Sequence, residues 1–385
     1  MRILVAHQVP GARTGGMSRI MGFIHDRVEA AGHQVDYLCA DDVPRTWSGK
    51  FGRSVAFPME VRSRAMSAAD AGRPYDIVNV HEPSAAPVVM GRRAAAPLVV
   101  VTSHGLERRA WELAMTEGRL GRLAPGWRSR LTYPATSLWP GDLALRRAEH
   151  VFCLNEEDRH ALMGRFGREP GTITRIMPGA DEVYAQAAEA RTYSAARRLL
   201  FAGTWRKNKG VEDIVPAVVA LAERHADVLL HVVGAGMSPD NVRAHFPDWL
   251  RPRVVCESPE DEAGTAAAFA AADVFLLPSL FEGTPLTLMQ AMMSGLPIVT
   301  TETCGMKDVI TSGHNGLLVP IRSPEAIVRA VERLLADAAL RQRLGRTARA
   351  EAHRLYTWDV VARPVLHAYE DLFHRHTSGK ALIRS

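Results

Sequence analysis

The chain has 385 residues, of which 47% are hydrophobic and 23% charged, and its formal net charge is +5. At roughly 150 residues per domain this length predicts two or three domains, and the apolar content excludes a disordered chain. The 30 glycines and 23 prolines form no periodic run, which excludes collagen-like and low-complexity proteins. The mild basic excess suits phosphates or an anionic membrane face. It argues against a nucleic-acid partner, which needs a concentrated basic stripe.

Cysteine spacing and hydropathy indicate the compartment. The four cysteines form no Cys-x-x-Cys pair and are expected to be reduced core residues. The apolar run of the N-terminus, residues 3–6, is too short for a signal peptide. Residues 283–301 are uncharged, but two prolines and Gln290 argue against a transmembrane helix. We expect a cytoplasmic location, with the inner face of the membrane as an open alternative.

Strands alternate with helices through residues 1–185, which we expect to form an N-terminal domain. Apolar residues from Met17 to Val28 recur at spacings of three and four, which predicts an amphipathic helix. The expected strands cover residues 3–6, 35–39, 76–80, 98–102, 150–154 and 172–177.

Residues 106–147 interrupt this alternation and form an expected insertion. They hold eight arginines against four acids, interleaved with aromatic and leucine side chains. One interpretation is an insertion with solvated arginines. The other is a basic amphipathic surface that makes peripheral contact with anionic lipid or binds an acidic acceptor. The sequence leaves both open.

Residues 198–355 show a cleaner alternation and are expected to form a C-terminal domain. Their strands are near-continuous apolar runs, which indicates a parallel sheet covered by helices on both faces. We therefore predict an α/β protein with two doubly wound Rossmann-like domains facing a central cleft, joined by a linker at 185–197. A helix at 356–375 is expected to pack back on the N-terminal domain, followed by a loose tail at 376–385.

Ligands of doubly wound sheets bind at the carboxyl ends of the strands, and several motifs fall there. Gly15 and Gly16 stand between the first strand and its helix, where backbone N–H groups favour an anion, although such a segment can also be a plain turn. Gly203 and Gly234 follow two strands of the second half and are expected to shape a nucleotide pocket.

Cations follow the first strand of the second half. Arg206 and Lys209 are suited to a diphosphate leaving group, whereas Lys207 fits a solvated charge better.

The string PSLFEGTPLTLMQAM carries the strongest signal. In it Glu282 follows a buried strand, and Gly283, Thr284 and Pro285 start a helix whose free N–H groups face the same side. Gln290 lies one to two turns into that helix.

Taken together, several strings resemble the family 4 glycosyltransferases, the retaining, nucleotide-sugar-dependent class with the GT-B fold, over residues 1–375. The resemblance rests on GG at 15–16, TSHGLE at 102–107, CLNEED at 153–158, IMPGAD at 176–181, GTWRKNKG at 203–210, VVGAG at 232–236, FEGTPLTLMQAM at 281–292, GLPIVTT at 295–301 and NGLLVP at 315–320.

The resemblance implies a donor site in the C-terminal domain and an acceptor site in the N-terminal one. Glu282 matches the first acid of the family's Glu-x(7)-Glu motif, which contacts the donor sugar, whereas Gln290 replaces the second acid, which binds the ribose. Lys209 and His104 match family positions. Thr204 stands where an arginine is common, so Arg206 is expected to take over its phosphate contact.

The expected reaction is retaining sugar transfer from a nucleotide-diphosphate sugar to a saccharide, lipid-linked or small-molecule acceptor, in polysaccharide, glycolipid or cell-envelope synthesis. No Asp-x-Asp triplet occurs, and we expect a metal-free site that needs no cofactor. His7, His81 and Glu82 are expected on the acceptor side. A GT-B-fold nucleotide-sugar epimerase and a non-catalytic nucleotide-sugar-binding protein remain as alternatives.

Overall fold

The computed structural model describes residues 1–12, 15–43, 50–91, 96–122, 125–194 and 196–384. It divides the chain into two units, the first made of residues 1–177 and 361–385 and the second of residues 178–360. Each unit has its own six-stranded sheet in which every neighbouring pair of strands is parallel. The predicted class, two doubly wound α/β domains, is confirmed.

The strands of the first unit form the order β2-β1-β3-β4-β5-β6. They are β1 (Arg2–His7), β2 (Gln34–Cys39), β3 (Ile77–His81), β4 (Leu98–Thr102), β5 (His150–Cys153) and β6 (Ile173–Arg175). The helices between them are α1 (Gly16–Ala30), η1 (Ala40–Asp42), α2 (Lys50–Asp70), α3 (Ala86–Met90), α4 (Glu107–Arg119), α5 (Trp127–Tyr133), η3 (Pro134–Leu138), α6 (Trp139–Arg147), α7 (Glu156–Phe166) and η4 (Pro170–Thr172).

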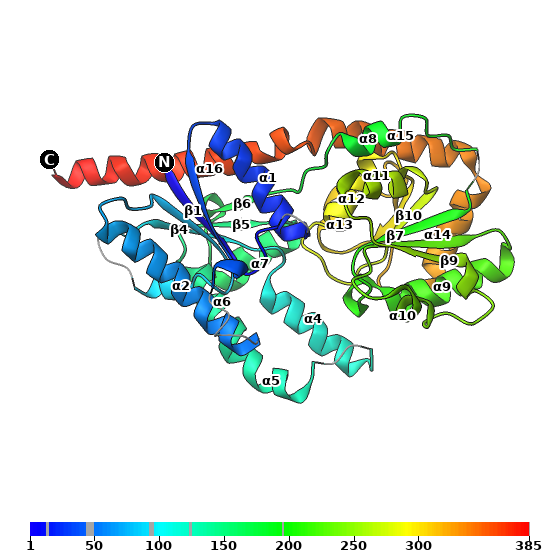
Figure 1. The fold of residues 1–385 in the computed structure, drawn as a ribbon, viewed down its shortest axis with the longest axis horizontal. Helices are drawn as coiled ribbons and strands as arrows, with labels where there is room; N and C mark the ends of the chain where they lie inside the picture. Colours follow the sequence, from blue (N-terminus) through cyan, green and yellow to red (C-terminus); the bar gives the residue numbers. More distant parts are fainter. Residues whose placement is uncertain (13–14, 44–49, 92–95, 123–124, 195, 385) are drawn as a thin grey trace. The chain divides into compact units, whose positions relative to one another are not determined.

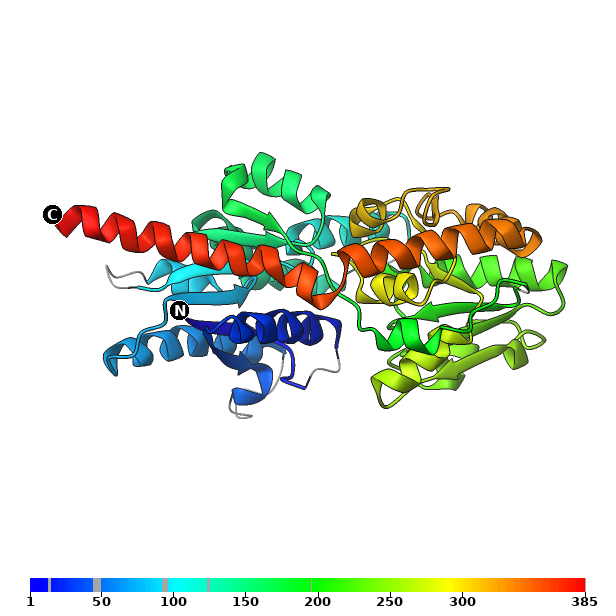
Figure 2. The ribbon, with the colours of Figure 1, turned by 90° about the horizontal axis from the view of Figure 1, so that it is seen from above.

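Helices cover both faces of this first sheet because its strands are apolar on both sides. Leu4 and Ala6 of β1 belong to a core shared with α2, α3, α6 and α7. On the other face lie α1 and the C-terminal part of α16 (Trp358–Arg384) (Figure 1). Seen from above, these two helices run over the same face (Figure 2). There Tyr369 is fully buried and its hydroxyl bonds His25 of α1 and Asn79 of β3, at 2.8 and 2.5 Å.

The strands of the second unit form the order β12-β11-β10-β7-β8-β9. They are β7 (Arg198–Ala202), β8 (Leu229–Val233), β9 (Val254–Glu257), β10 (Val274–Leu277), β11 (Ile298–Thr301) and β12 (Leu317–Val319). The helices are α8 (Val183–Ala187), η5 (Lys207–Lys209), α9 (Val211–Arg224), α10 (Pro239–Arg243), η6 (Arg251–Arg253), α11 (Glu262–Ala270), α12 (Leu286–Met293), α13 (Cys304–Val309), α14 (Pro324–Ala336) and α15 (Ala338–Leu355).

The second core follows the same principle. Leu199 and Phe201 of β7 pack with the apolar stripes of α9 and α14 on one face of the sheet. Figure 1 shows α8, α11 and α12 on the opposite face. Two-sided burial explains why these strands are short, continuous apolar runs rather than alternating ones.

Two expectations about the chain's organisation differ from the structure. Residues 185–197, expected as a linker, lie in the second unit, because Arg191 donates to the carbonyls of Phe269, Ala270, Ala272 and Ser294 and so fixes this segment to the fold. The chain passes between the units at Met177–Pro178 instead. The loose tail expected at 376–385 is wrong, since α16 continues to Arg384.

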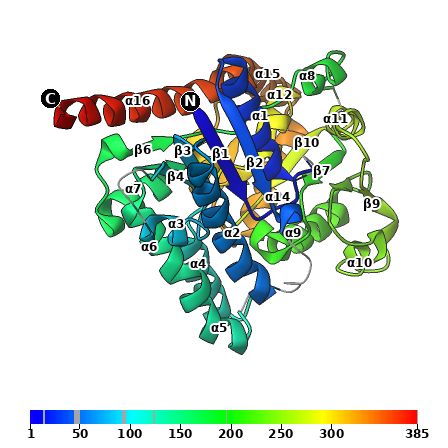
Figure 3. The same ribbon diagram turned by 60° about the vertical axis from the view of Figure 1, so that its left-hand side comes forward.

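The insertion at 106–147 consists mainly of the helices α4, α5, η3 and α6, with short non-helical stretches between α4 and α5. Helices α4 and α5 extend away from the sheet of the first unit (Figures 1 and 3). None of the helices in the described ranges combines the length and the apolar character that crossing a bilayer requires.

Candidate functional site

The strand order of the second unit reverses between β7 and β10, which are neighbours in the sheet although β7 leads to β8 and β10 leads to β11. Doubly wound sheets bind ligands at such a switch point, outside the carboxyl ends of the strands. Lys209 follows β7 and Glu282 follows β10. The fold therefore brings together two residues that lie far apart in the sequence.

Lys209 and Glu282 form an ion pair at this edge. Ser279 Oγ, which is fully buried, donates to Glu282 Oε1 at 3.1 Å. Thr301 of β11 in turn donates to the Ser279 carbonyl at 2.5 Å. The carboxylate is thus held between a cation and a hydroxyl, which fixes its orientation before any ligand binds. Sequence analysis singled out Lys209 and Glu282 but not Ser279, although its place three residues before the acid was visible.

Gly210 explains why the two loops lie so close. It has a φ of +76°, and a Cβ at this position would stand 1.9 Å from the Pro278 carbonyl oxygen. Only glycine combines that conformation with that approach. The amide of Leu280 also donates to the Asn208 carbonyl at 2.8 Å, so the backbone after β10 is tied to the turn that carries Lys209.

The other two cations of this turn differ from Lys209. Lys207 pairs with Glu212 at 2.6 Å, at the start of α9. The side chain of Arg206 is exposed, and no ion pair of it is recorded within the part of the chain that the structure describes. Lys209 is therefore the cation fixed at the switch point, and Arg206 stands at its rim.

Gly283, Thr284 and Pro285 lead into α12 as expected, with Pro285 as the residue before the helix. The loop is held from α13, because the amide of Gly305 donates to the Gly283 carbonyl at 2.9 Å. A Cβ on Gly305 would lie 2.2 Å from Thr284 Oγ1, so this contact also requires glycine.

Gln290 lies buried in the second turn of α12, and its Nε2 donates to Glu262 Oε1 of α11 at 3.3 Å. The amide that stands where the resemblance implies an acid therefore has a carboxylate beside it. Sequence analysis missed Glu262, because nothing in the spacing of residues 262 and 290 indicates that α11 and α12 meet.

Gly203 and Gly234 both have positive φ angles, of 142° and 69°, with open space where a Cβ would stand. The amide of Gly203 donates to the Val233 carbonyl, and the amide of Gly234 to the Glu257 carbonyl, at 2.8 and 2.9 Å. They turn the chain at the ends of β7 and β8, at the same edge of the sheet as Lys209.

The first unit has an equivalent switch point between β1 and β3. His7 ends β1, His81 ends β3, and His104 follows β4, so three imidazoles stand in a row at the carboxyl ends of adjacent strands. The rings of His81 and His104 stack with centroids 5.3 Å apart. Burial lowers the pKa of His81 to about 4 and also lowers those of His7 and His104. This edge is therefore lined by neutral imidazoles at physiological pH.

Glu82, expected on the acceptor side, is buried beneath this row. Its Oε1 accepts from Ser103 Oγ and from the Glu107 amide at the start of α4, at 2.9 and 3.0 Å. Its Oε2 has no hydrogen-bond partner among the residues described. Burial, with the neighbouring Glu107 charge, raises the pKa of Glu82 to about 8. The carboxyl is thus protonated at neutral pH and supports the start of α4.

Gly15 and Gly16 stand where α1 begins and are exposed, with Gly15 as the N-cap. Thr14 of the same loop lies outside the described residues. No side-chain cap hydrogen bond is recorded at this described start of α1, so the backbone N–H groups of its first turn carry no such partner.

Comparison with known proteins agrees with this architecture. A family model described as "Glycosyltransferase Family 4" matches residues 14–183, and one described as "Glycosyl transferases group 1" matches residues 196–337. Together they cover most of the chain, one in each half.

Two curated relatives are similar over part of the chain. A D-inositol 3-phosphate glycosyltransferase of Corynebacterium glutamicum is 30% identical over 56% of this chain and 56% of its own length. A phosphatidyl-myo-inositol mannosyltransferase of Mycobacterium leprae is 27% identical over 77% of this chain and 73% of its own. The chain thus spans about half the length of the first of these relatives.

Solved structures share the fold over nearly the whole chain. Sucrose-phosphate synthase from Thermosynechococcus elongatus has a TM-score of 0.76 at 20% identity, over 97% of this chain and 99% of that one. The lipopolysaccharide-biosynthesis glycosyltransferase WaaG has a TM-score of 0.73 at 20% identity, over 95% and 98%.

Proposed function

The chain belongs to the family 4 glycosyltransferases of the GT-B fold, and from that premise we propose that it moves a sugar from a nucleoside-diphosphate sugar to an acceptor hydroxyl with retention of anomeric configuration. The observation that carries the proposal is the contact between Lys209 and Glu282 at the switch point of the second sheet. The cation suits the diphosphate of such a donor, and the acid suits the hydroxyls of its sugar.

In this proposal the second unit binds the donor. Lys209 and Arg206 stabilise the negative charge that develops on the departing diphosphate, and Glu282 accepts hydrogen bonds from sugar hydroxyls. The N–H groups at the start of α12 add partial positive charge on the same side. The two cations and these N–H groups would supply the positive charge that a metal ion supplies in metal-dependent enzymes, so the proposed reaction needs no metal and no cofactor.

The proposed transfer balances without a protein nucleophile. The bond between the anomeric carbon and the diphosphate oxygen breaks, and a bond to the acceptor oxygen forms on the same face. The acceptor proton moves to the departing phosphate oxygen. The acceptor, a saccharide, a small molecule or a lipid-linked sugar, binds the first unit.

The donor site is tested by alanine variants of the two contacting residues. We expect Lys209→Ala and Glu282→Ala each to lower kcat by about 10²–10³ while the melting temperature changes little, since each removes a group that stabilises the transition state. Lys207→Ala is the matched control, because it also removes an ion pair from the same turn. Turnover is measured with UDP-, GDP- and ADP-sugars and saccharide or lipid-linked acceptors. Near-wild-type rates in both site variants, or an equal loss in the control, would contradict the assignment.

Two further measurements define the reaction. The anomeric configuration of the product, read by NMR, tests retention. Incubation with donor alone separates transfer from epimerisation, since an epimerase converts the donor without an acceptor. Tight nucleotide binding with no turnover on any acceptor favours a binding protein.

We also propose peripheral contact between α4–α5 and an anionic membrane at the inner face of the cell membrane. Trp127 and Leu131 of α5 are 68% and 71% exposed. The guanidinium of Arg128 lies 5.2 Å from the Trp127 ring, so aromatic and cationic groups stand together on one exposed helix. Aromatic side chains enter the lipid interface while arginines meet anionic headgroups, and that combination supports the proposal.

The membrane proposal has a matched control in the second unit. Trp249 is 49% exposed and has the Arg253 guanidinium 5.3 Å from its ring, but it lies outside α4–α5. We expect Trp127→Ala with Leu131→Ala to weaken sedimentation with phosphatidylglycerol vesicles roughly tenfold, and Trp249→Ala to leave it unchanged. Equal sedimentation of all three proteins would overturn the membrane contact.

A further inference from the structure

A cavity of about 360 Å³ lies between α1 and β2 in the first unit, beside the end of β1. Its volume falls at the lower end of the range usual for small-molecule sites. The carboxyl ends of β1 and β2 form part of its wall. Doubly wound sheets bind their ligands at this edge. Side chains with polar atoms line it, namely those of His7, Ser18, Tyr37, Cys39, Asp41 and Asp42.

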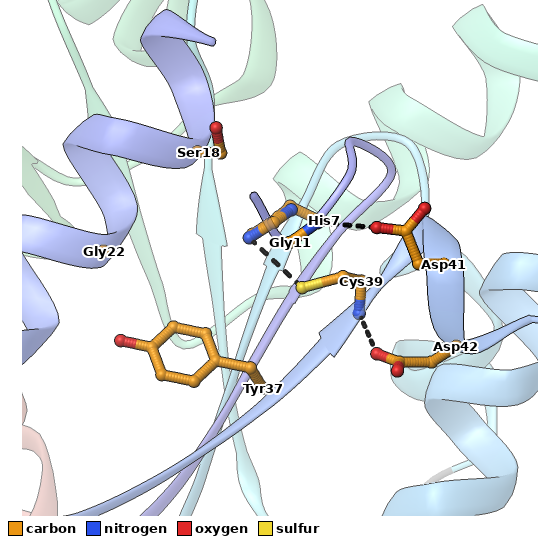
Figure 4. A pocket seen from close by; sticks show the side chains of 8 residues that line it. All are labelled: His7, Gly11, Ser18, Gly22, Tyr37, Cys39, Asp41 and Asp42. Atoms are coloured by element: carbon orange, nitrogen blue, oxygen red, sulfur yellow. Dashed lines mark hydrogen bonds between the residues drawn. The ribbon is translucent and has the colours of Figure 1, made fainter. Parts of the chain in front are cut away.

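Figure 4 shows how these side chains are arranged. The carboxylates of Asp41 and Asp42 stand on one side of the cavity and the Tyr37 ring on the other, with His7 and Cys39 between them. The described lining therefore offers oxygen acceptors on one side and the Tyr37 ring on the other. This is the combination that rings with many hydroxyls use, since their C–H faces pack on aromatic rings and their hydroxyls donate to carboxylates.

Both carboxylates are held in place by the backbone of the lining. The amide of Gly11 donates to Asp41 Oδ2 at 2.9 Å, and the amide of Cys39 donates to Asp42 Oδ2 at 2.7 Å. Each of these bonds uses one oxygen of the carboxylate. Because the acids are fixed before a ligand arrives, a ligand hydroxyl that meets them pays little ordering entropy.

The remaining titratable groups of the lining carry no compensating positive charge. Burial lowers the pKa of His7, whose Nδ1 lies 3.2 Å from the Val9 carbonyl and whose Nε2 lies 3.7 Å from Cys39 Sγ. Burial and the nearby aspartates raise the pKa of Cys39 to about 11, so its thiol is neutral. Among the lining residues that the structure describes there is no lysine or arginine. The charged side chains of the described lining are therefore those of Asp41 and Asp42.

We propose that this cavity binds a polyhydroxylated ring of the acceptor that carries no phosphate at the bound end, with ring hydroxyls donating to Asp41 and Asp42. The assignment rests on the proposed function, because it names the acceptor class of that reaction. It separates this chain from relatives whose names specify an inositol phosphate. A phosphate dianion placed in this cavity would face two carboxylates, whereas a neutral or amine-bearing ring would not.

The test compares each ring with its own phosphate. The full chain is titrated with glucose, mannose, glucosamine and myo-inositol, and separately with the monophosphate of each, by saturation-transfer NMR and calorimetry. We expect at least one free ring to bind, and its monophosphate to bind roughly tenfold more weakly. Asp41→Asn with Asp42→Asn keeps both acceptor oxygens for the Gly11 and Cys39 amides and removes the charge. In this double variant the ratio between the affinities for the free ring and for its monophosphate should fall at least about fivefold.

The controls keep the outcome decisive. Glu29→Gln removes an exposed carboxylate of the same unit outside the cavity and should leave this ratio unchanged. Melting temperatures show whether each variant folds. If the double variant does not fold, the two single Asn variants are measured in its place. Equal or tighter binding of the monophosphates, or binding of no free ring, would overturn the inference. The proposed function is read separately from UDP, GDP and ADP binding and from turnover, both measured on the wild-type chain.

Discussion

Gly210 gives the sharpest test of how the fold builds the proposed donor site. In Gly210→Ala the new Cβ would start 1.9 Å from the Pro278 carbonyl oxygen, and real Cβ atoms do not approach closer than 3.0 Å. The loops after β7 and β10 must therefore separate by about 1 Å. A left-handed φ adds about 1–2 kcal/mol of strain for alanine. Because these loops carry Lys209 and Glu282, we expect kcat to fall about 10²-fold, the effect of a displacement of this size in an active site.

Gly313 separates the effect of the contact with Pro278 from the strain of a positive φ. It also has a positive φ, of 82°, in the second unit, but nothing lies within 4 Å of the position of its Cβ. Gly313→Ala should therefore lose only about 1–2 kcal/mol, a fall in melting temperature of roughly 2–8 °C, with kcat unchanged. Turnover and thermal melts of both variants decide the matter. Full activity in Gly210→Ala, or equal losses of activity in the two variants, would show that the contact with Pro278 does not position the site.

Two further predictions concern buried acids and amides. Because burial holds the pKa of Glu82 near 8, above its ordinary 4.5, the stability that its proton provides is complete below about pH 4.5 and is lost as the pH rises toward 8. Glu82→Gln should therefore have a higher melting temperature than the wild type above pH 8 and the same melting temperature near pH 4.5. The exposed Glu29→Gln is the control. Curves of melting temperature against pH that run parallel for Glu82→Gln and the wild type would contradict this. Gln290→Glu places a second carboxylate beside Glu262, 3.3 Å from the present amide nitrogen, so it should lower the melting temperature without tightening UDP, GDP or ADP binding. Adding Glu262→Gln should restore stability, and no recovery in the double variant would show that the two residues do not interact.

Position along the chain was enough to predict that Lys209 and Glu282 lie at one edge of the second sheet. Lys209 and Glu282 each follow an apolar strand, and in a parallel sheet all carboxyl ends meet at one edge. The sequence alone could not show that β7 and β10 are neighbours, and it is the strand order that turns two separate strand-end residues into an ion pair.

Other features depend on contacts that leave no local pattern. Arg191 lies in a segment of small and polar residues typical of a linker. Its guanidinium nevertheless donates four hydrogen bonds to carbonyls of α11, of the turn after it and of the residue after α12. Glu262 has the ordinary position of an acid in the first turn of a helix, and only the packing of α11 beside α12 brings it to Gln290. In the sequence, Asp41 and Asp42 are two adjacent acids typical of a solvated turn. Only the structure shows that each accepts a hydrogen bond from a backbone amide of the cavity lining.

The two switch points have opposite electrostatic character, and this follows from where each unit places its charges. The second sheet ends in a lysine paired with an acid and an exposed arginine, at an edge suited to a charged diphosphate. The first sheet ends in imidazoles that burial keeps neutral, above a glutamate that burial keeps protonated, beside a cavity whose fixed charges are negative. The proposed reaction, which holds an anionic donor and leaves the acceptor hydroxyl uncharged until transfer, uses that asymmetry. It also predicts that raised salt will weaken nucleotide binding more than binding of a neutral ring, since only the first depends on charge.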